Sequence, residues 1–390
     1  STTHAMLNYL QYLFNNLDSG NLIFSIFLDF RKAFDCVNHE ILLSKLQIYG
    51  IRGKAFDWFR SYLDNRKQYV LINDCESDLK TIKCGVPQGS ILGPLLFLIF
   101  INDITKASNF FKYVLYADDS TLSTCIREDE LGKYSKIINN ELILLHSWLK
   151  ANKIAINQTK TKFMILSYNK NVLIPEIKIG ENLIDEADSI KFLGIHIDNH
   201  LTFRDHIHKT AIKISKSLGL LFKLNKFLPS NILKILYSTL IHPYLIYGLE
   251  AWHGTFKNNT NKIFILQKKA IRAINNLDYN EHTTDYFKSC KILKLEDQYK
   301  FQITTFIYKI LNLNADNELM SKLQINSQVH QHGTRQEDKI NIPRIKKARS
   351  KFSLFQNGAK NWNSLPKDIR NLGSLHKFKS KTFSHFLDKY

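Results

Sequence analysis

Several features are scarce in this 390-residue sequence, and each scarcity excludes a class of protein. Acidic side chains are too few to balance the basic ones: 35 Asp and Glu stand against 54 Lys and Arg, which gives a formal net charge of +19. Long apolar runs are absent as well, because the richest one, residues 91–104, is broken by Pro94 and is too short to cross a bilayer. We predict that this run is a buried helix. The charge favours a polyanionic partner, nucleic acid and not a membrane.

Cysteine is scarce too, and its pattern excludes a disulfide framework or a zinc site. The five cysteines are an odd number, lie far apart and show neither a C-x-x-C pair nor a Cys/His zinc pattern (Cys36, Cys75, Cys84, Cys125 and Cys290). We therefore predict core thiols in a reducing compartment, and an intracellular protein of the nucleus, the cytoplasm or both. No secretory signal opens the chain, which begins with Ser and not Met, so we expect a fragment of a longer protein.

The remaining composition, 44% hydrophobic and 12% aromatic, is that of a globular protein large enough for two or three domains. A half that mixes strands and helices precedes a helical half, with the change near residue 200. Apolar periodicity predicts helices at residues 1–17, 41–50, 56–63, 128–149, 212–222, 232–241, 262–274 and 295–311. Strands are predicted at residues 22–28, 68–73, 81–83, 111–115, 120–124, 163–166, 176–179 and 190–197.

Two adjacent acids, Asp118 and Asp119, lie between the apolar runs 111–115 and 120–124. Two strands that meet at a tight turn predict a β-hairpin with both carboxylates at its tip. Because neighbouring carboxylates repel each other, a hard divalent cation with oxygen ligands would stabilise the pair. The alternative is an ordinary solvent-exposed turn, since Asp favours turns through its own hydrogen bonds.

A third acid, Asp29, ends the nearly continuous apolar run 22–28, which is typical of a strand buried on both faces. It precedes Asp118 by 89 residues (118 minus 29). If the two strands are neighbours in one sheet, three carboxylates converge and form the oxygen cage that two Mg²⁺ ions need to align a 3′-hydroxyl with an α-phosphate. Spacing alone leaves this adjacency open.

The stretches around these acids resemble the reverse transcriptases of non-LTR, jockey-like retrotransposons. Residues 27–35 (FLDFRKAFD) resemble motif A, 85–94 (GVPQGSILGP) motif B and 116–119 (YADD) motif C, while 148–162 and 192–194 are similar to motifs D and E. Weaker similarity continues through the helical half, with His242, Trp252, Gln267 and Arg272, to the stretch WNSLP at 362–366.

The resemblance implies an α+β right-hand polymerase with an antiparallel palm sheet, partial fingers and a helical thumb. The implied division is a palm with partial fingers at 1–200, in which 36–84 lies on the fingers side, a thumb-like region at 201–315 and a basic C-terminal region at 316–390. The family's fingers begin upstream of the first residue, so we expect that part of the nucleotide clamp is missing. No endonuclease domain or Cys/His knuckle is expected either.

Carried over residue by residue, the resemblance implies that Asp29, Asp118 and Asp119 bind the metal ions. We expect Asp119 to bind them less directly, because neighbouring side chains on a hairpin point to opposite faces. Phe34 is expected to exclude a 2′-hydroxyl by steric clash, and its alternative is an ordinary core residue. Gln88 and Gly89 are expected to contact the nucleotide and the template, with a structural turn as the alternative.

Basic residues carry the remaining site predictions. Lys160 or Lys162 would place a cation, as a general acid, beside the leaving pyrophosphate. Arg31 and Lys32 would contact the triphosphate, although a solvated position is the alternative for both.

Other polar residues are interpreted as structural. These are Asp35, whose side chain would point away from Asp29 if the strand continued, and His39 and His206, which we expect to be hydrogen-bonded and not metal ligands. The basic stretch 335–351 is either an exposed connector or a segment that contacts phosphates.

The predicted function is RNA-directed DNA synthesis with two Mg²⁺ ions, for which Mn²⁺ can substitute. The expected partners are an RNA template, in particular the element's own RNA, a DNA primer and dNTPs, with no membrane. Two alternatives stay open: another palm polymerase, such as an RNA-templated RNA polymerase, and an inactive nucleic-acid-binding remnant.

Overall fold

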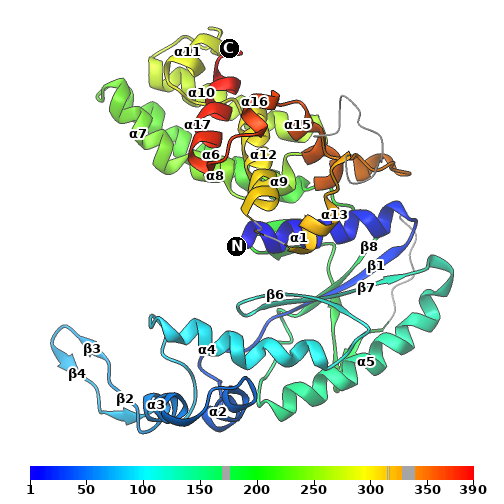
Figure 1. Ribbon diagram of the computed structural model, residues 1–390. Helices are drawn as coiled ribbons and strands as arrows, with labels where there is room; N and C mark the ends of the chain where they lie inside the picture. Colours follow the sequence, from blue (N-terminus) through cyan, green and yellow to red (C-terminus); the bar gives the residue numbers. More distant parts are fainter. Residues whose placement is uncertain (169–175, 314, 316, 327–338) are drawn as a thin grey trace. The chain divides into compact units, whose positions relative to one another are not determined.

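The computed structural model describes residues 1–168, 176–313, 315, 317–326 and 339–390. These residues form two compact units, Asn21–Asp188 on the one hand and Ser1–Gly20 with Ser189–Tyr390 on the other. The first unit combines a sheet with helices, and the second is mostly helical (Figure 1). The assignment of palm, thumb and basic C-terminal functions to the predicted ranges stays a prediction.

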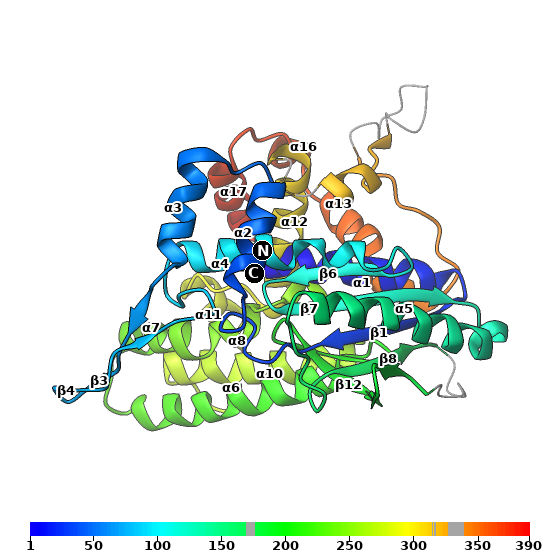
Figure 2. The same ribbon diagram turned by 90° about the horizontal axis from the view of Figure 1, so that it is seen from below.

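A five-stranded sheet is the centre of the Asn21–Asp188 unit, with the strand order β11-β8-β1-β7-β6. The central strand pairs antiparallel with both neighbours, and β6 with β7, whereas β11 runs parallel to β8. Figure 2 shows β1 between β7 and β8. The strands span β1 Leu22–Leu28, β6 Lys112–Tyr116, β7 Asp119–Ile126, β8 Lys162–Leu166 and β11 Asp185–Glu186.

Strand β1 is buried along its whole length, which confirms the strand predicted from its continuous apolar run. Successive side chains of a strand point to opposite faces, and Phe24 and Ile26 lie on the face that packs into the main hydrophobic core of this unit. Helices α4 and α5 (Leu92–Ile101 and Leu131–Ala151) contribute to the same core. On the other face, the buried hydroxyl groups of Ser25 and Ser123 form a hydrogen bond with each other at 2.8 Å.

The other elements of this unit are short and flank the sheet. Helices follow β1, and four two-residue strands form two small antiparallel ladders where we predicted the strands 68–73 and 81–83. The bounds are α2 His39–Ile48, α3 Gly53–Leu63, β2 Lys67–Gln68, β3 Leu71–Ile72, β4 Cys75–Glu76, β5 Lys80–Thr81, β9 Lys178–Ile179 and β10 Asn182–Leu183, with 3₁₀ turns at Asn102–Lys106 and Glu128–Glu130.

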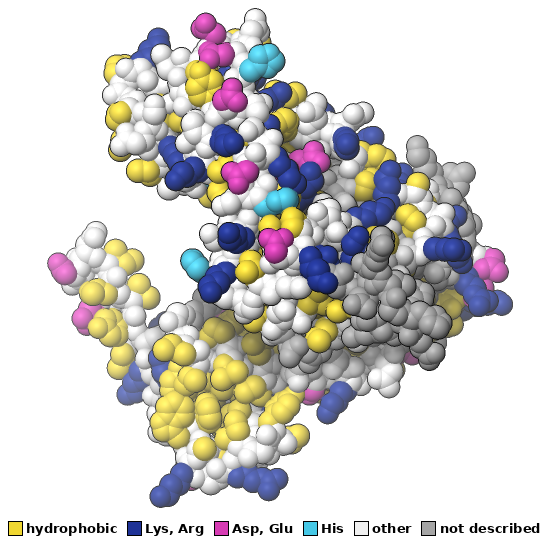
Figure 3. All heavy atoms as spheres, turned by 45° about the horizontal axis from the view of Figure 1, so that its top comes forward, with side chains coloured by type: hydrophobic (Ala, Val, Ile, Leu, Met, Phe, Trp, Pro, Cys, Tyr) yellow, Lys and Arg dark blue, Asp and Glu magenta, His cyan; other side chains and the backbone are white. Residues whose placement is uncertain are grey.

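The prediction that residues 91–104 form a fully buried helix is wrong in part. Helix α4 buries Leu96, Phe97 and Phe100 in the core, but Ile91 is 95% exposed and Leu95 is 50% exposed. An all-apolar sequence carries no polar face that would reveal which side meets solvent. Hydrophobic side chains accordingly gather on part of the surface of this unit, at the lower left of Figure 3.

The described part of the second unit is mostly helical and contains the two-stranded hairpin β12–β13. The stretch 190–197, which we predicted as a single strand, folds back on itself as β12 and β13, because Leu193 and Gly194 take up left-handed backbone conformations at its centre. The bounds are α1 Thr2–Asp18, β12 Ser189–Phe192, β13 Ile195–Asp198, α6 Arg204–Leu224, α7 Ser230–Leu240, α8 His242–Ile246, α9 Leu249–Trp252, α10 Lys257–Asn275, α11 Thr284–Ser289, α12 Leu295–Leu313, α13 Asn317–Lys322, α15 Ala359–Asn363, α16 Lys367–Arg370 and α17 Leu375–Leu387, with a 3₁₀ turn at Ala348–Phe352 and a π-helical turn at Leu354–Gly358.

The first helix of the chain begins as predicted. The side chain of Ser1 caps it by accepting a hydrogen bond from the His4 backbone N–H. Its apolar stripe packs against α9 and the turns 348–352 and 354–358, all within the second unit. The first 20 residues therefore join the C-terminal helices and not the sheet that follows them in sequence.

The cysteine prediction is confirmed in one part and wrong in the other. All five thiols are free, as expected. Only Cys290 is buried, whereas Cys36 is half-buried and the remaining three are exposed (Cys75, Cys84 and Cys125). Their burial could not be read from residue type, because it depends on short ladders and strand ends that the sequence pattern did not resolve.

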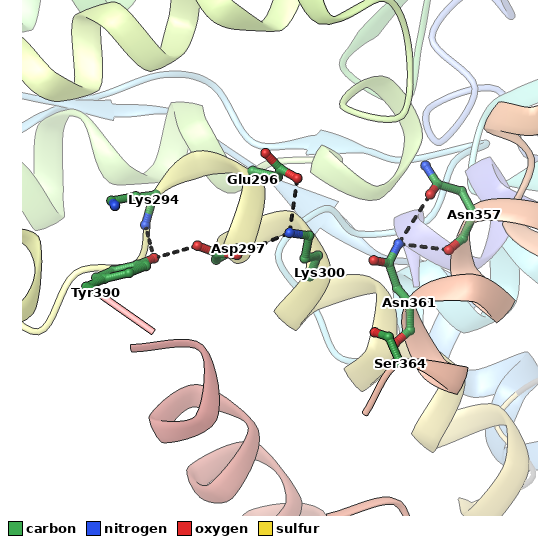
Figure 4. A network of polar contacts seen from close by, with 8 residues as sticks. All are labelled: Lys294, Glu296, Asp297, Lys300, Asn357, Asn361, Ser364 and Tyr390. Carbon is green, nitrogen blue, oxygen red and sulfur yellow. Dashed lines mark hydrogen bonds and ion pairs between the residues drawn. The ribbon is translucent and has the colours of Figure 1, made fainter. Parts of the chain in front are cut away.

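A polar network ties the last residue of the chain to α12 (Figure 4). The Lys294 backbone N–H donates to the Tyr390 hydroxyl at 2.7 Å, and this hydroxyl donates to Asp297 at 2.9 Å. Lys300 pairs with Asp297 at 3.3 Å and with Glu296 at 3.0 Å. Burial raises the pKa of Tyr390, so the phenol stays protonated and keeps its role as donor.

Glu250 of helix α9 is a carboxyl group whose environment disfavours its charge. Burial raises its pKa to about 7, although its own backbone N–H and the charge of Lys309 act in the opposite direction. An acid whose pKa is higher in the folded than in the unfolded state binds its proton more tightly when folded. The contribution of this residue to stability is therefore lost as the pH rises from about 4.5 through 7.

We expect the Glu250→Gln substitution to remove this loss. The free energy of unfolding should rise at pH 8 by up to about 3 kcal/mol. At pH 4.5 it should change by less than about 0.5 kcal/mol, because the carboxyl group is protonated in the folded state and already about half protonated in the unfolded state. Urea unfolding at the two pH values measures this difference, with exposed Asp368→Asn as the control. Identical pH profiles for the Glu250→Gln variant and the unmodified chain would contradict it.

Candidate active site

The backbone on both sides of Asp29 is held by the segment that precedes β8. The Asp29 N–H donates to the Thr161 hydroxyl at 3.2 Å, and the Asp29 carbonyl accepts from the Asn157 N–H at 2.7 Å. The Arg31 N–H donates to the Ala155 carbonyl at 2.8 Å. Asp29 is thus fixed at the point where the central strand ends, and Thr161 and Asn157 are site residues that the sequence analysis missed.

Asp118 lies in the turn of the β6–β7 hairpin, as predicted. Tyr116 and Asp119 are partners in the ladder, so Ala117 and Asp118 alone form the turn. Ala117 has a φ of 51°, in the left-handed region where a side chain costs roughly 1–2 kcal/mol. In the same sheet Leu28 is opposite Ser120, and this register brings the end of β1 next to the hairpin.

These two acids line one open cavity of about 720 Å³. Most of the predicted site residues are found there, although they come from four separate stretches of sequence. The lining residues are Asp29, Phe30, Arg31, Lys32, Ala33, Phe34, Cys36, Gln88, Asp118, Asn157 and Lys160. Two predicted residues, Asp119 and Gly89, are not among them. The roles of all these residues stay predictions.

The charge in the cavity is mixed. Lys160 lies 3.9 Å from Asp29, measured from Nζ to Oδ2, and their side chains are 69% and 40% exposed. An ion pair this long and exposed contributes little to stability, so both groups remain available to a ligand. Lys162, the alternative to Lys160, forms a 2.6 Å ion pair with Asp185 instead and does not line the cavity.

The two acids fit a divalent cation in donor chemistry, since carboxylate oxygens are the ligands that Mg²⁺ prefers. Within the described residues, however, no group of three His, Cys, Asp or Glu side chains is placed to hold a metal ion. Asp119 is exposed, and the structure does not bring it to the cavity with Asp29 and Asp118.

The wall of the cavity is built by two loops clamped together. The Val86 N–H donates to the Phe34 carbonyl at 2.8 Å, and the Gly85 N–H donates to the Val37 carbonyl at 2.7 Å. A ring nitrogen of His39 donates to the Gly85 carbonyl at 2.7 Å, which agrees with the structural role expected of this histidine.

Two side chains of this wall are also held in place. The Gln88 Nε2 donates to the carboxylate of Asp35 at 2.9 Å, so Asp35 fixes the orientation of the Gln88 amide. The strand does not continue as far as Asp35, because β1 ends at Leu28 and residues 31–36 form turns. The Phe34 ring stacks on Phe97 of α4, with 4.5 Å between centroids, and is thereby fixed at the cavity edge.

Other predicted residues lie outside this site. His206 is buried in α6, where burial lowers its pKa to about 4, so its ring stays neutral near pH 7. Of the basic stretch 335–351, residues 335–338 lie outside the described residues.

No helix in the described ranges is both long enough and apolar enough to cross a membrane.

One carboxylate at the end of the central strand, a second in the adjacent hairpin and a lysine from the segment before β8 line a candidate site for metal-dependent phosphoryl transfer. Comparison with known proteins agrees: residues 3–197 match the family "Reverse transcriptase (RNA-dependent DNA polymerase)". The chain therefore belongs to the reverse transcriptase family, and the predicted α+β right-hand polymerase class is confirmed by this membership and by the sheet, which is antiparallel except for the pairing of β11 with β8.

Relatives among curated proteins are polymerases of mobile elements, as the predicted resemblance implied. The RNA-directed DNA polymerase from mobile element jockey of Drosophila funebris is 31% identical over 313 residues, which cover 76% of this chain and 33% of the relative. The probable RNA-directed DNA polymerase from transposon BS of Drosophila melanogaster is 28% identical over 319 residues, covering 76% and 34%. The chain thus spans about a third of the length of these relatives.

Among solved structures, apo telomerase from Candida tropicalis is similar to this chain at a TM-score of 0.40 and 16% identity. The match covers 81% of this chain and 56% of the telomerase chain.

Gly85 is the residue on which the clamp between the two loops depends. Its φ is +92°, and a Cβ atom at this position would lie 2.8 Å from the Asp35 carbonyl oxygen, closer than atoms pack. We expect Gly85→Ala to destabilise the chain by about 2–3 kcal/mol, a drop that thermal unfolding detects.

Gly89→Ala provides the matched control for that substitution. Gly89 also has a positive φ, +79°, but a Cβ atom there would meet nothing within 4 Å. Its replacement therefore isolates the cost of backbone strain, about 1 kcal/mol. If the two substitutions lowered the stability equally, the close approach of Gly85 to Asp35 would be refuted.

Proposed function

We propose that this chain catalyses RNA-templated extension of a DNA primer with dNTPs, as the polymerase of a non-LTR retrotransposon. The observation that carries the proposal is the meeting of Asp29 and Asp118 in one cavity, although 89 residues separate them in sequence. Family membership supports the same chemistry. The proposal covers the activity of this chain, which is about a third of the length of its curated relatives.

Asp29 and Asp118 would hold the divalent cations that reverse transcriptases generally use, and Asp119, which does not line the cavity, would act less directly. Two Mg²⁺ ions, or Mn²⁺ in their place, would favour ionisation of the primer 3′-hydroxyl and offset the negative charge of the phosphates. The carboxylates contribute fixed oxygen donors, because the hairpin turn and the contacts of Thr161 and Asn157 position their backbone before a ligand binds.

The other cavity residues would bind the nucleotide. Arg31 would contact the triphosphate, and Lys160 would donate a proton to the leaving pyrophosphate from its place beside Asp29. The amide of Gln88, oriented by Asp35, would meet the nucleotide, and Gly89 would let the template approach closely. The template we propose is RNA, in particular the element's own RNA, and the primer is DNA.

The first test is primer extension with Mg²⁺ on an RNA template, comparing the unmodified chain with Asp118→Asn. This substitution keeps the shape of the side chain but removes its charge, and we expect it to lower the rate at least about 100-fold. Asp57→Asn, which removes an exposed acid from α3, is the matched control and should keep full activity.

The outcomes of this test separate the alternatives. Extension by Asp118→Asn at the unmodified rate would refute the metal site. Extension with NTPs in preference to dNTPs would indicate an RNA polymerase. RNA binding by the unmodified chain without any extension would instead favour a remnant that binds nucleic acid.

Phe34 provides a second test, which concerns the sugar of the nucleotide. Its ring lines the cavity and is backed by Phe97, so a ribose 2′-hydroxyl would meet a side chain that cannot move away. We expect Phe34→Val to raise the efficiency of NTP incorporation relative to dNTP by about tenfold or more, because the smaller side chain relieves the clash.

The readout is the ratio of kcat/KM values for dGTP and GTP on the same primer and template. A ratio is insensitive to the general loss of activity that follows from a less stable core. If the ratio stayed unchanged while dGTP was still incorporated, Phe34 would be an ordinary core residue.

A further inference from the structure

We propose that residues 344–351 form a binding surface for the phosphate backbone of a single-stranded nucleic acid, and that Asp18 holds this surface in its binding conformation. The proposal goes beyond polymerase activity. Its phosphate-binding residues lie outside the stretch 3–197 that matches the family, although Asp18 lies within it, and it requires neither the cavity nor a metal. Only the choice of the template RNA as the natural ligand rests on the proposed function.

The first observation is a concentration of unpaired positive charge. Residues 339–351 contain no acid. In the described part of the chain, four exposed basic side chains of this stretch have no carboxylate oxygen within 4.0 Å and therefore form no ion pair. They are Arg344, Lys346, Lys347 and Lys351. An exposed run of this kind is expected to attract a polyanion.

Charge by itself does not distinguish this stretch, because Lys and Arg side chains are spread over much of the face drawn in Figure 3. What distinguishes it is a fixed backbone. The carboxylate of Asp18, at the end of α1, accepts the N–H groups of Lys346 at 3.0 Å and Lys347 at 2.7 Å. Lys346 and Lys347, whose side chains form no ion pair in the described part of the chain, are therefore held through their main chain.

The charged state of Asp18 follows from the same contacts. Burial acts to raise its pKa, but the N–H groups of Lys347 and Lys346 and the positive charge of Lys346 outweigh this and hold the pKa below its usual value. The carboxylate is thus ionised near pH 7, when it is the stronger acceptor for both N–H groups.

Contacts on both sides of this anchor extend the fixed region. The Gln356 side chain donates to the Pro343 carbonyl, and Arg349 donates to the His200 carbonyl at 3.0 Å. Ser350 is buried within the 3₁₀ turn Ala348–Phe352. Because the backbone is ordered before a ligand arrives, little conformational entropy remains to be lost on binding.

The chemistry of the surface fits phosphates better than a protein partner. Protein interfaces rely on aromatic or other large side chains that fill pockets, and residues 343–351 contain no aromatic residue. Flexible ammonium groups and one exposed guanidinium on a fixed backbone are suited to successive phosphates, which carry charge without sequence information. We therefore infer binding that depends on salt and not on base sequence.

The test uses the full chain and an unstructured 20-nucleotide RNA, without divalent metal or dNTPs, and measures affinity by fluorescence anisotropy between 50 and 200 mM salt. Lys346→Gln with Lys347→Gln should lower the slope of log K against log salt by about 1.4, and the affinity at 0.1 M salt on the order of tenfold. Lys379→Gln with Lys381→Gln removes the same charge from exposed positions of α17 and is the matched control.

Asp18→Ala separates a fixed surface from simple attraction. The substitution raises the net positive charge by one, so charge alone predicts tighter RNA binding. Loss of the anchor predicts binding that is weaker by about three- to tenfold, because the stretch must then be ordered on binding. Circular dichroism and thermal unfolding confirm that this variant is folded. Unchanged or tighter binding by the folded Asp18→Ala variant would overturn the role of Asp18.

The remaining outcomes decide the rest of the proposal. Equal losses in the two double lysine variants would overturn the assignment of the surface to residues 344–351. A single-stranded DNA of the same length identifies the source of the phosphates: a loss on RNA, alone or together with DNA, supports the proposal, and a loss on DNA alone overturns it for RNA. A chain that binds RNA in this way but extends no primer would refute the proposed function and leave this inference standing.

Discussion

The antiparallel pairing of β1 with β7 is the interaction on which the candidate site depends. β1 is fully buried and is paired on both sides, so a slip by one residue would take Phe24 and Ile26 out of the main core and turn Ser25 toward it. The register places Leu28 opposite Ser120, two residues beyond Asp118 in the hairpin turn. Hydrophobic packing thus determines where a carboxylate from each strand lies.

The structure around the acids is held mainly by backbone groups. Thr161 and Asn157 fix Asp29, and the loop 84–88 is bound to the loop 34–39 by main-chain hydrogen bonds and by His39. Charged side chains of the cavity, in contrast, have few partners among the described residues, apart from the long contact between Lys160 and Asp29. A rigid frame that carries incompletely paired charges is suited to a charged ligand, because the frame does not need to reorganise when the ligand binds.

The second unit combines the same two features away from the cavity. Its backbone is held at several points, at Lys294 by the Tyr390 hydroxyl and at residues 346 and 347 by Asp18, while Lys346 and Lys347 remain exposed. Part of the net charge of +19 thus lies on exposed lysines whose main chain is held in place. There the Asp18 carboxylate accepts hydrogen bonds from backbone N–H groups and forms no ion pair with a lysine side chain among the described residues.

The sequence by itself determined the class of the fold, most of its elements and the stretches that carry the site. Continuous burial of β1, the β6–β7 hairpin and the long helices α5, α6, α10 and α12 follow from apolar patterns, because periodicity reports which face of an element is buried. Sequence patterns failed where one pattern fits two structures. The all-apolar α4 does not show which of its sides is exposed, and the stretch 190–197 reads as one strand although Leu193 and Gly194 turn it into a hairpin.

Only the tertiary structure decided which residues meet. It brought Asp118, but not Asp119, to the cavity of Asp29, and it paired Lys162 with Asp185 while leaving Lys160 beside Asp29. It also revealed the contacts of Thr161, Asn157 and Asp18, which no local pattern announces. The physical reason is that strand register and loop packing join segments more than 80 residues apart, whereas the information in a local sequence pattern extends over a single helix or strand.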